Sequence, residues 1–168
     1  MSRRLIIMRH AKSDWGSGAV TDFDRPLNGR GERDARRMGR WLRDKDFIPE
    51  RMVSSPAIRA RGTAKLVAKA LGVDAATIEW DRRIYEAEVG ALLAVLDAHH
   101  RDERVQLMVG HNPGLERLVL HLARAETLPG HDKTLPTAAV YVLEFALDEE
   151  LQAGQGVCIA HMRPRWLE

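Results

Sequence analysis

The amino-acid sequence predicts an α/β fold, a three-layer α/β/α sandwich built around a mostly parallel central sheet. Short apolar runs of strand length alternate along the chain with longer segments in which apolar residues recur every three or four positions. No internal repeat and no low-complexity linker interrupts this alternation. Since 45% of the 168 residues are hydrophobic, we expect one domain over residues 1–168 with a substantial buried core.

Two of the expected strands are strong candidates. Leu5, Ile6, Ile7 and Met8 form a continuous apolar run, which is typical of a short buried strand. Residues 105–109, Val-Gln-Leu-Met-Val, form a second run of this kind. Weaker strand candidates are 51–54, 77–80, 139–145 and 157–161.

Four helices are expected between these strands. The first begins after Asn28, a residue type that caps helix N-termini, and the second ends at Gly72, a residue type that commonly follows a helix. The apolar positions of the four helices, in chain order, are Ala35, Met38 and Leu42; Ala60, Ala64, Val67 and Leu71; Val89, Leu92, Leu93 and Leu96; and Leu115, Leu118, Val119 and Leu122.

Composition argues against several classes of partner and location. The net charge is only +2, which is no basis for binding nucleic acid or an anionic membrane. The one cysteine, Cys158, excludes an internal disulfide and fits a reducing compartment. The first apolar run is too short for a signal peptide, and no stretch is long enough to span a bilayer. We therefore expect a cytoplasmic protein, a monomer or small homo-oligomer, that uses no cofactor.

Residues that can bind phosphate follow three of the expected strands. Arg9 and His10 come directly after the first strand, and His111 follows the strand at 105–109. Arg59 lies in the first turn of the helix that follows the strand at 51–54. In open α/β sheets, ligands bind beyond the carboxyl ends of the strands, so we expect these side chains at one edge of the sheet.

The four side chains together suit phosphoryl transfer. A phosphate monoester carries close to two negative charges, and Arg9 and Arg59 can each bind it through two hydrogen bonds. His10 can be neutral near pH 7 and act as a nucleophile, while His111 can donate a hydrogen bond to the equatorial oxygens. The helix after Pro113 is expected to direct free N–H groups at the same phosphate. Because the arginines supply positive charge, this chemistry needs no metal.

Four sequence blocks resemble those of a known family. Residues 5–11, Leu-Ile-Ile-Met-Arg-His-Ala, resemble the RHG signature of the histidine phosphatase (phosphoglycerate mutase-like) superfamily. Residues 54–64 and 110–113 resemble its second-arginine and second-histidine blocks, and residues 24–31 are similar to a segment of its SixA-like branch. The resemblance implies a phosphoglycerate mutase-like fold with His10 as the phosphoryl acceptor and His111 as a second catalytic histidine. The phosphate-binding residues that it implies are Arg9, Arg59, Ser13 and Asn112.

The general acid is assigned from a weaker resemblance. Residues 83–86, Arg-Ile-Tyr-Glu, resemble the block that carries this glutamate in other branches, so Glu86 is the candidate. Cleavage of an alkyl phosphate requires such a proton donor more than cleavage of phosphohistidine does. Two departures stand out: Ala11 replaces the usual glycine, and Gly16 follows Trp15 where the mutase branch has asparagine. The second departure argues against mutase activity.

We expect a phosphatase that acts on phosphohistidine or another phosphorylated protein side chain. SixA-like members lack the long insertions that cover the mutase active site, and this chain is similarly short. An open pocket would admit a side chain on a protein surface. The alternative is a phosphatase for a small phosphorylated metabolite, and a second alternative is a phosphoprotein-binding module without turnover.

Other chemistries are not supported. Cys158 and Arg163 are one residue too close for the loop of a cysteine phosphatase. Asp22 and Asp24 have the spacing of an aspartyl-phosphate motif, but no apolar strand precedes them. The histidines lack the spacing of zinc ligands, and no phosphate-binding loop of the Walker type occurs.

Overall fold

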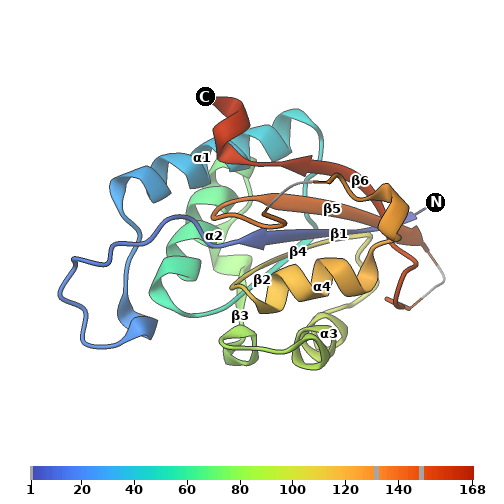
Figure 1. Ribbon diagram of the computed structural model, residues 1–168, viewed down its shortest axis with the longest axis horizontal. Helices are drawn as coiled ribbons and strands as arrows, with labels where there is room; N and C mark the ends of the chain where they lie inside the picture. The colour runs from blue at the N-terminus through green and yellow to red at the C-terminus, as the bar shows by residue number, and fades with distance from the viewer. Residues whose placement is uncertain (1, 131–132, 148–149) are drawn as a thin grey trace.

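A computed structural model describes residues 2–130, 133–147 and 150–168. Its centre is a six-stranded sheet in the order β3-β2-β4-β1-β5-β6 (Figure 1). Strands β1, β2, β3 and β4 are mutually parallel where they pair, whereas β5 runs antiparallel to β1, and β6 antiparallel to β5. The strand bounds are β1 Ser2–Arg9, β2 Arg51–Ser54, β3 Glu79–Trp80, β4 Val105–Gly110, β5 Val140–Ala146 and β6 Val157–Met162.

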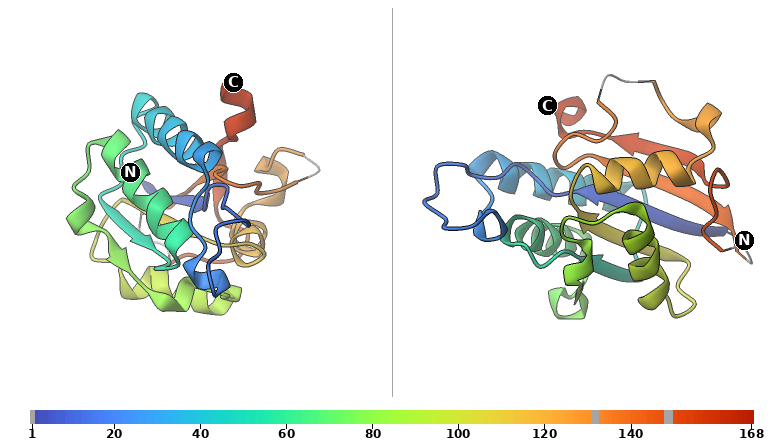
Figure 2. Two further views of the ribbon diagram at one scale, coloured as in Figure 1. Left: turned by 90° about the vertical axis from the view of Figure 1, so that its left-hand side faces the viewer. Right: turned by 60° about the horizontal axis from the view of Figure 1, so that its bottom comes forward.

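Helices cover both faces of the sheet, which confirms the predicted three-layer sandwich. Helices α1 (Gly29–Asp44) and α2 (Ile58–Leu71) pack on one face, and α3 (Val89–Ala98) and α4 (Gly114–Leu122) pack on the other (Figure 2). Five short 3-10 turns occur in the described part of the chain, four between these elements and one after β6. They are η1 Asp22–Asp24, η2 Ala75–Thr77, η3 Arg82–Ile84, η4 Ala125–Thr127 and η5 Pro164–Leu167.

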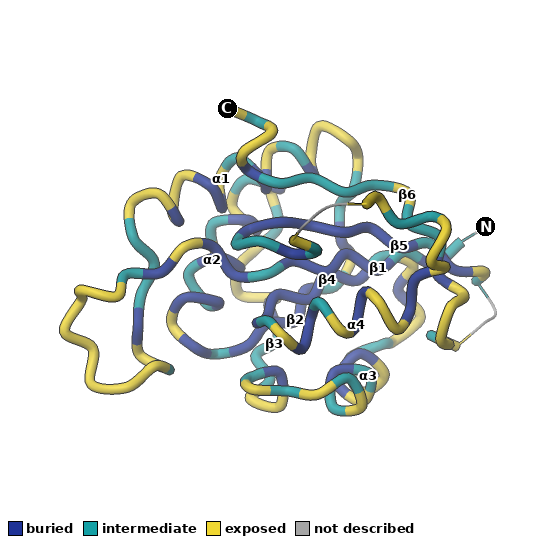
Figure 3. Tube along the Cα trace, viewed as in Figure 1, coloured by how far each residue is buried: buried dark blue, intermediate teal, exposed yellow. Residues whose placement is uncertain are grey.

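The apolar run of β1 lies at the centre of two cores. Leu5 and Ile7 face the α3–α4 layer, whereas Ile6 and Met8 face the α1–α2 layer. All four side chains are at most 1% exposed. Successive side chains of a strand point to opposite faces, so a strand with helices on both sides is apolar throughout. Figure 3 shows the consequence as a buried centre with exposed connections around it.

Local signals in the sequence placed the helix ends correctly. The side chain of Asn28 accepts a hydrogen bond from the Gly31 amide at 2.8 Å and caps α1. Gly72 follows α2 with φ of 76°, the left-handed conformation that favours glycine. The strand expected at 77–80 is shorter than predicted, because residues up to Thr77 belong to the 3-10 turn η2, which the Asp74 side chain caps.

The carboxyl ends of the parallel strands meet at one edge of the sheet, and a long connection between β1 and α1 extends beyond that edge (Figure 1). Part of this connection is strongly exposed: Trp15 is 81% and Val20 is 96% accessible. It returns to the body at Gly31, where a Cβ atom would lie 2.0 Å from the Lys12 carbonyl oxygen, so only glycine allows this approach. No helix among the described residues is long and apolar enough to cross a membrane.

Candidate active site

His10 lies directly beyond β1 and is only 6% exposed. Its Nδ1 is 2.7 Å from the carbonyl oxygen of Ala11. A carbonyl can only accept a hydrogen bond, so Nδ1 carries the proton and Nε2 keeps its lone pair. Burial lowers the pKa of His10 to about 3, and the positive charges nearby act in the same direction. The imidazole is therefore neutral at neutral pH and presents a nucleophilic nitrogen.

His111 follows β4 and faces His10, with ring centroids 5.2 Å apart. Its Nε2 lies 2.8 Å from the hydroxyl oxygen of Ser55, which in turn accepts a hydrogen bond from the Ala57 amide at 3.2 Å. When the Ser55 hydroxyl donates its proton to Nε2, Nδ1 of His111 carries the N–H group that can donate to a phosphoryl oxygen. Burial, followed by the charge of Arg59, lowers the pKa of His111 to about 4.

Thr63 joins the His10 loop to the helix that carries Arg59. Its hydroxyl accepts a hydrogen bond from the Ala11 amide at 2.9 Å and donates one to the Arg59 carbonyl at 2.8 Å. The Thr63 side chain is fully buried. The histidine from β1 and the arginine from α2 are therefore held in a fixed relation by one side chain.

Arg59 is 5% exposed and is bound by Asp22 of the long β1–α1 connection. Its Nη1 donates to the Asp22 carbonyl at 2.7 Å, and its Nη2 donates to the Asp22 carboxylate at 2.9 Å. The same carboxylate accepts from Arg25 at 2.8 Å and from the Tyr85 hydroxyl at 2.7 Å. Hydrogen bonds from Arg25 and then Tyr85 hold the pKa of Asp22 well below its usual range, so it stays ionised. The guanidinium group of Arg59, which the sequence assigns to phosphate binding, is thus paired with the carboxylate of Asp22 in this structure.

Arg9 and Asn112 share a partner on the loop before β5. Nη1 of Arg9 donates to the Leu135 carbonyl at 3.3 Å, and the Asn112 amide donates to the same oxygen at 2.7 Å. The side-chain oxygen of Asn112 accepts from the Glu116 amide at 3.3 Å. Both ends of the Asn112 side chain are therefore engaged, and phosphate binding by this residue stays a prediction.

The start of α4 offers fewer free amides than the sequence suggests. The Leu115 amide donates to the His111 carbonyl at 2.9 Å, and the Glu116 amide donates to Asn112. The expectation that this helix directs its first-turn N–H groups at phosphate is therefore wrong for these two. The side-chain oxygen of Asn112 accepts from the Glu116 amide and so satisfies one of them locally, which is a common use of that side chain.

Ser13 lines the smaller of two cavities at the site, together with His10 and Arg9, and this cavity has a volume of about 140 Å³. Its hydroxyl oxygen accepts a hydrogen bond from Arg25, which leaves the Ser13 proton free to donate. Arg25 also stacks on the Trp15 ring at 3.5 Å. Contact of Ser13 with phosphate stays a prediction that this geometry permits.

Glu86 lines a cavity of about 410 Å³ together with Asp22, Arg59 and His111. It is exposed, and its φ of 54° is unusual for a residue with a side chain. The next residue packs against α4, where a Cβ on Gly114 would lie 2.4 Å from the Ala87 carbonyl oxygen. Because Gly114 has no side chain, the segment of Glu86 and Ala87 can pack against the start of α4, on the side of the cavity that His111 lines.

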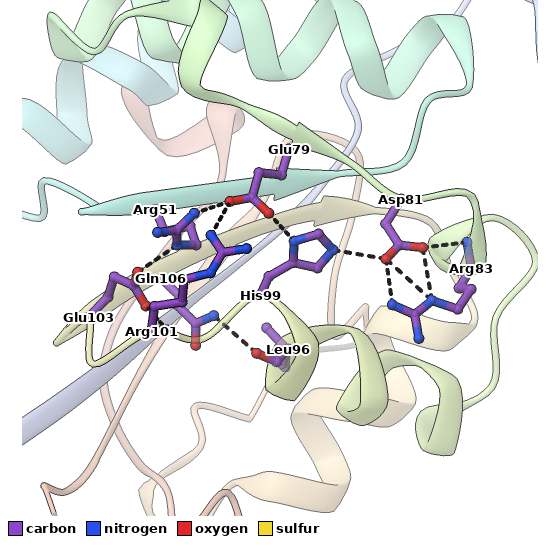
Figure 4. Close-up of polar contacts among 9 residues, drawn as sticks. All are labelled: Arg51, Glu79, Asp81, Arg83, Leu96, His99, Arg101, Glu103 and Gln106. Carbon is purple, nitrogen blue, oxygen red and sulfur yellow. Dashed lines mark hydrogen bonds and ion pairs between the residues drawn. The ribbon is translucent and has the colours of Figure 1, made fainter.

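An ion-pair network anchors the segment that leads to Tyr85 (Figure 4). The ring of His99, at the end of α3, contacts Glu79 through Nδ1 and Asp81 through Nε2, the latter at 2.9 Å. Asp81 also accepts a hydrogen bond from Arg83 at 2.7 Å. His99, which follows α3, thus connects β3 with Asp81 at the start of η3, the turn that leads to the wall of the larger cavity.

The buried side-chain nitrogen atoms without a hydrogen-bond partner among the described residues include Nε of Arg9, Nε of Arg59 and Nδ1 of His111. Buried donors are rarely left unpaired, because each costs about 1–3 kcal/mol. A tetrahedral oxyanion could accept from all three. The described residues contain no cluster of three or more His, Cys, Asp or Glu side chains able to hold a metal ion.

The structure brings His10, His111, Arg9 and Arg59 together as predicted and adds residues that the sequence did not reveal. Asp22 and Thr63 hydrogen-bond to Arg59, Ser55 hydrogen-bonds to His111, and the Tyr85 ring packs edge-on against the His111 ring. Ser55 and Thr63 lie within the block 54–64, so the resemblance of that block to the family could have indicated them. Nothing in the sequence pairs Asp22 with Arg59, 37 positions away.

Comparison with known proteins gives consistent matches. A family model described as histidine phosphatase superfamily (branch 1) matches residues 5–94. An uncharacterised protein of Mycobacterium tuberculosis is 33% identical over 147 residues, which cover 83% of this chain and 87% of that protein. An uncharacterised chloroplastic protein of Arabidopsis thaliana is 43% identical over 65 residues, and this match spans 39% of this chain and only 30% of that protein.

Two further matches carry a functional name. The phosphohistidine phosphatase SixA of Escherichia coli K12 is 30% identical over 127 residues, which cover 75% of this chain and 78% of that protein. A solved structure of the protein histidine phosphatase SixA complexed with tungstate superimposes with a TM-score of 0.81 at 27% identity. That superposition covers 98% of this chain and 99% of the other.

Proposed function

Because this chain belongs to the histidine phosphatase superfamily, in its SixA-like branch, we propose that it hydrolyses phosphohistidine or another phosphorylated protein side chain through a phosphohistidine intermediate on His10. The observation that carries the proposal is the hydrogen bond from Nδ1 of His10 to the Ala11 carbonyl, which leaves Nε2 as the free nucleophile. The two relatives named SixA support the choice of a phosphorylated protein as substrate.

In the first step, Nε2 of His10 attacks phosphorus and the bond to the leaving group breaks. Arg9 and Arg59 bind the phosphoryl oxygens, and Nδ1 of His111 donates to the oxygen on which negative charge grows. Arg59 must exchange Asp22 for phosphate in this step. The two guanidinium groups supply the positive charge, so the proposed reaction requires no metal.

In the second step, water attacks phosphorus, the P–N bond breaks, and inorganic phosphate leaves neutral His10, while a proton of the water returns to the group that donated one in the first step. The leaving group of the first step takes a proton: an imidazole accepts one readily, whereas an alkoxide requires a donor. Glu86 on the cavity wall is the proposed donor. Its position is the observation that keeps a small phosphorylated metabolite as a second candidate substrate.

The decisive experiment traps the intermediate. Rapid quenching with ³²P-labelled substrate should yield a phosphoryl group on the protein that is labile in acid and stable in base, and His10→Ala should lose both label and turnover. His121→Ala, which changes an exposed histidine, is the matched control. Near-normal activity of His10→Ala would refute the mechanism, and activity lost to EDTA and restored by zinc or magnesium would refute its metal independence. Binding of phosphoprotein with no turnover would indicate a binding module.

A further inference from the structure

A second cleft, of about 230 Å³, lies between the start of α1, the loop before β5 and the C-terminal turn η5. Four cationic residues line it: Arg30 from α1, Lys133 from the loop, and Arg163 and Arg165 from the C-terminal segment. We refer to these four residues and the space between them as the basic cleft. Figure 2 (left) shows the C-terminal turn beside α1 on the side of the molecule where the parallel strands end.

The positive charge of the basic cleft is only partly neutralised. One carboxylate, Asp34, lines it and is 3% exposed, but Asp34 already pairs with Arg30 at 3.6 Å and with Arg37 at 3.9 Å. Lys133 and Arg165 are exposed and form no ion pair with any residue that the structure describes. Burial raises the pKa of Asp34 and the charge of Glu168, which follows η5, acts in the same direction, so a second carboxylate lies close to the cleft but is exposed. The cleft therefore keeps cations available for an outside anion.

The basic cleft lies next to the candidate active site. Thr137 lines both the cleft and the smaller cavity that contains Arg9 and His10. The same loop contacts the site twice: the Leu135 carbonyl accepts from Arg9, and the Ala138 amide donates to the His10 carbonyl at 3.1 Å. A chain that placed its phosphorylated side chain at His10 could therefore lay its neighbouring residues over Thr137 into the cleft.

We propose that the basic cleft is a substrate-recognition surface that binds acidic residues flanking the phosphorylated side chain of a protein. This inference rests on the function proposed above and specifies the substrate further. Lys133 and Thr137 are four positions apart, and an extended chain spans at most about 3.5 Å per residue, so Lys133 lies no more than about 14 Å from Thr137. Asp or Glu within about four to six positions of the phosphorylated residue would reach it.

The test compares two histidine-phosphorylated peptides, an acidic one with Asp and Glu beside the phosphohistidine and a neutral one with Asn and Gln at the same positions. The third substrate is p-nitrophenyl phosphate, which has no neighbouring residues. The wild-type protein should show a higher kcat/KM for the acidic peptide, and the preference should fall as salt screens the charges. Each exposed ion pair contributes roughly 1.4- to 5-fold, so the double variant Lys133→Glu/Arg165→Glu should lower kcat/KM for the acidic peptide by about 2- to 25-fold. Its rates with the neutral peptide and p-nitrophenyl phosphate should stay unchanged.

Arg40→Glu is the matched control, because it reverses an exposed charge on α1 farther along the helix from Arg30 and should keep the preference. Thermal unfolding of each variant establishes that it is folded, and the single variants Lys133→Gln and Arg165→Gln repeat the test with smaller changes. Equal rates for the two peptides, or an equal loss on all substrates, would overturn the recognition surface while leaving the phosphatase intact. A loss confined to a bisphosphorylated metabolite would assign the cleft to a small molecule instead. No hydrolysis of any substrate would overturn the proposed function itself, and this inference with it.

Discussion

Asp22 is expected to compete with phosphate for Arg59, and Asp22→Asn tests this directly. The carboxylate of Asp22 and its carbonyl together engage both Nη atoms of Arg59, so a phosphate must displace it or share the guanidinium with it. Asparagine keeps the size and the carbonyl contact but removes the negative charge. The substitution should therefore strengthen the binding of inorganic phosphate and vanadate.

The expected gain follows from the exposure of the ion pair. A hydrogen bond to a charged group contributes about 1.5–3 kcal/mol when buried, whereas an exposed ion pair contributes about 0.2–1 kcal/mol. The Asp22 side chain is 46% exposed and that of Arg59 is 6% exposed, which places this pair between the two cases. A difference of about 1–2 kcal/mol corresponds to an inhibition constant for phosphate that is roughly 5- to 30-fold lower.

The assay is competitive inhibition of p-nitrophenyl phosphate hydrolysis by phosphate at low ionic strength. Asp24→Asn is the control, because it removes the same charge from the same 3-10 turn, and the Asp24 side chain contacts Thr21 rather than Arg59. Asp22→Asn should lower the inhibition constant and Asp24→Asn should leave it nearly unchanged. An unchanged constant for Asp22→Asn, or an equal change in both variants, would refute the competition.

Two further predictions follow from Glu86 and His10. Glu86→Gln should lower hydrolysis of an alkyl phosphate by about 10²–10⁴-fold and spare phosphohistidine and p-nitrophenyl phosphate; an equal loss on all three would mean that Glu86 binds phosphate rather than donating a proton. The pKa of His10 is lowered to about 3 in the folded protein, whereas that of a histidine in the unfolded chain is about 6.5. Between these two values the unfolded chain binds more protons than the folded chain, so the free energy of unfolding should fall as pH decreases from 6.5 towards 3. The free energy of unfolding, measured by urea unfolding between pH 4 and 6, should therefore depend less steeply on pH in His10→Asn, by about 1.4 kcal/mol per pH unit. The control variant His121→Asn should follow the wild type. Identical slopes for His10→Asn and the wild type would show that His10 does not titrate in this way.

The sequence by itself predicted the architecture and the group of residues that the structure brings together at the candidate site. The apolar run of β1, the cap at Asn28 and the end of α2 at Gly72 are local features, because each depends on neighbouring residues only. The convergence of His10, Arg59 and His111 followed from one general property of parallel sheets, that their carboxyl ends meet at one edge. Three strands with histidine or arginine after them are sufficient for that prediction.

Only the tertiary structure decided what surrounds those side chains. Asp22 reaches Arg59 because the long β1–α1 connection folds back over the site, and no local pattern encodes that path. The basic cleft joins Arg30, Lys133 and Arg165 from three distant segments, each of which is an ordinary exposed charge in the sequence. Such contacts depend on how irregular connections pack against the sheet, and a connection without hydrophobic periodicity leaves no pattern from which its path could be predicted.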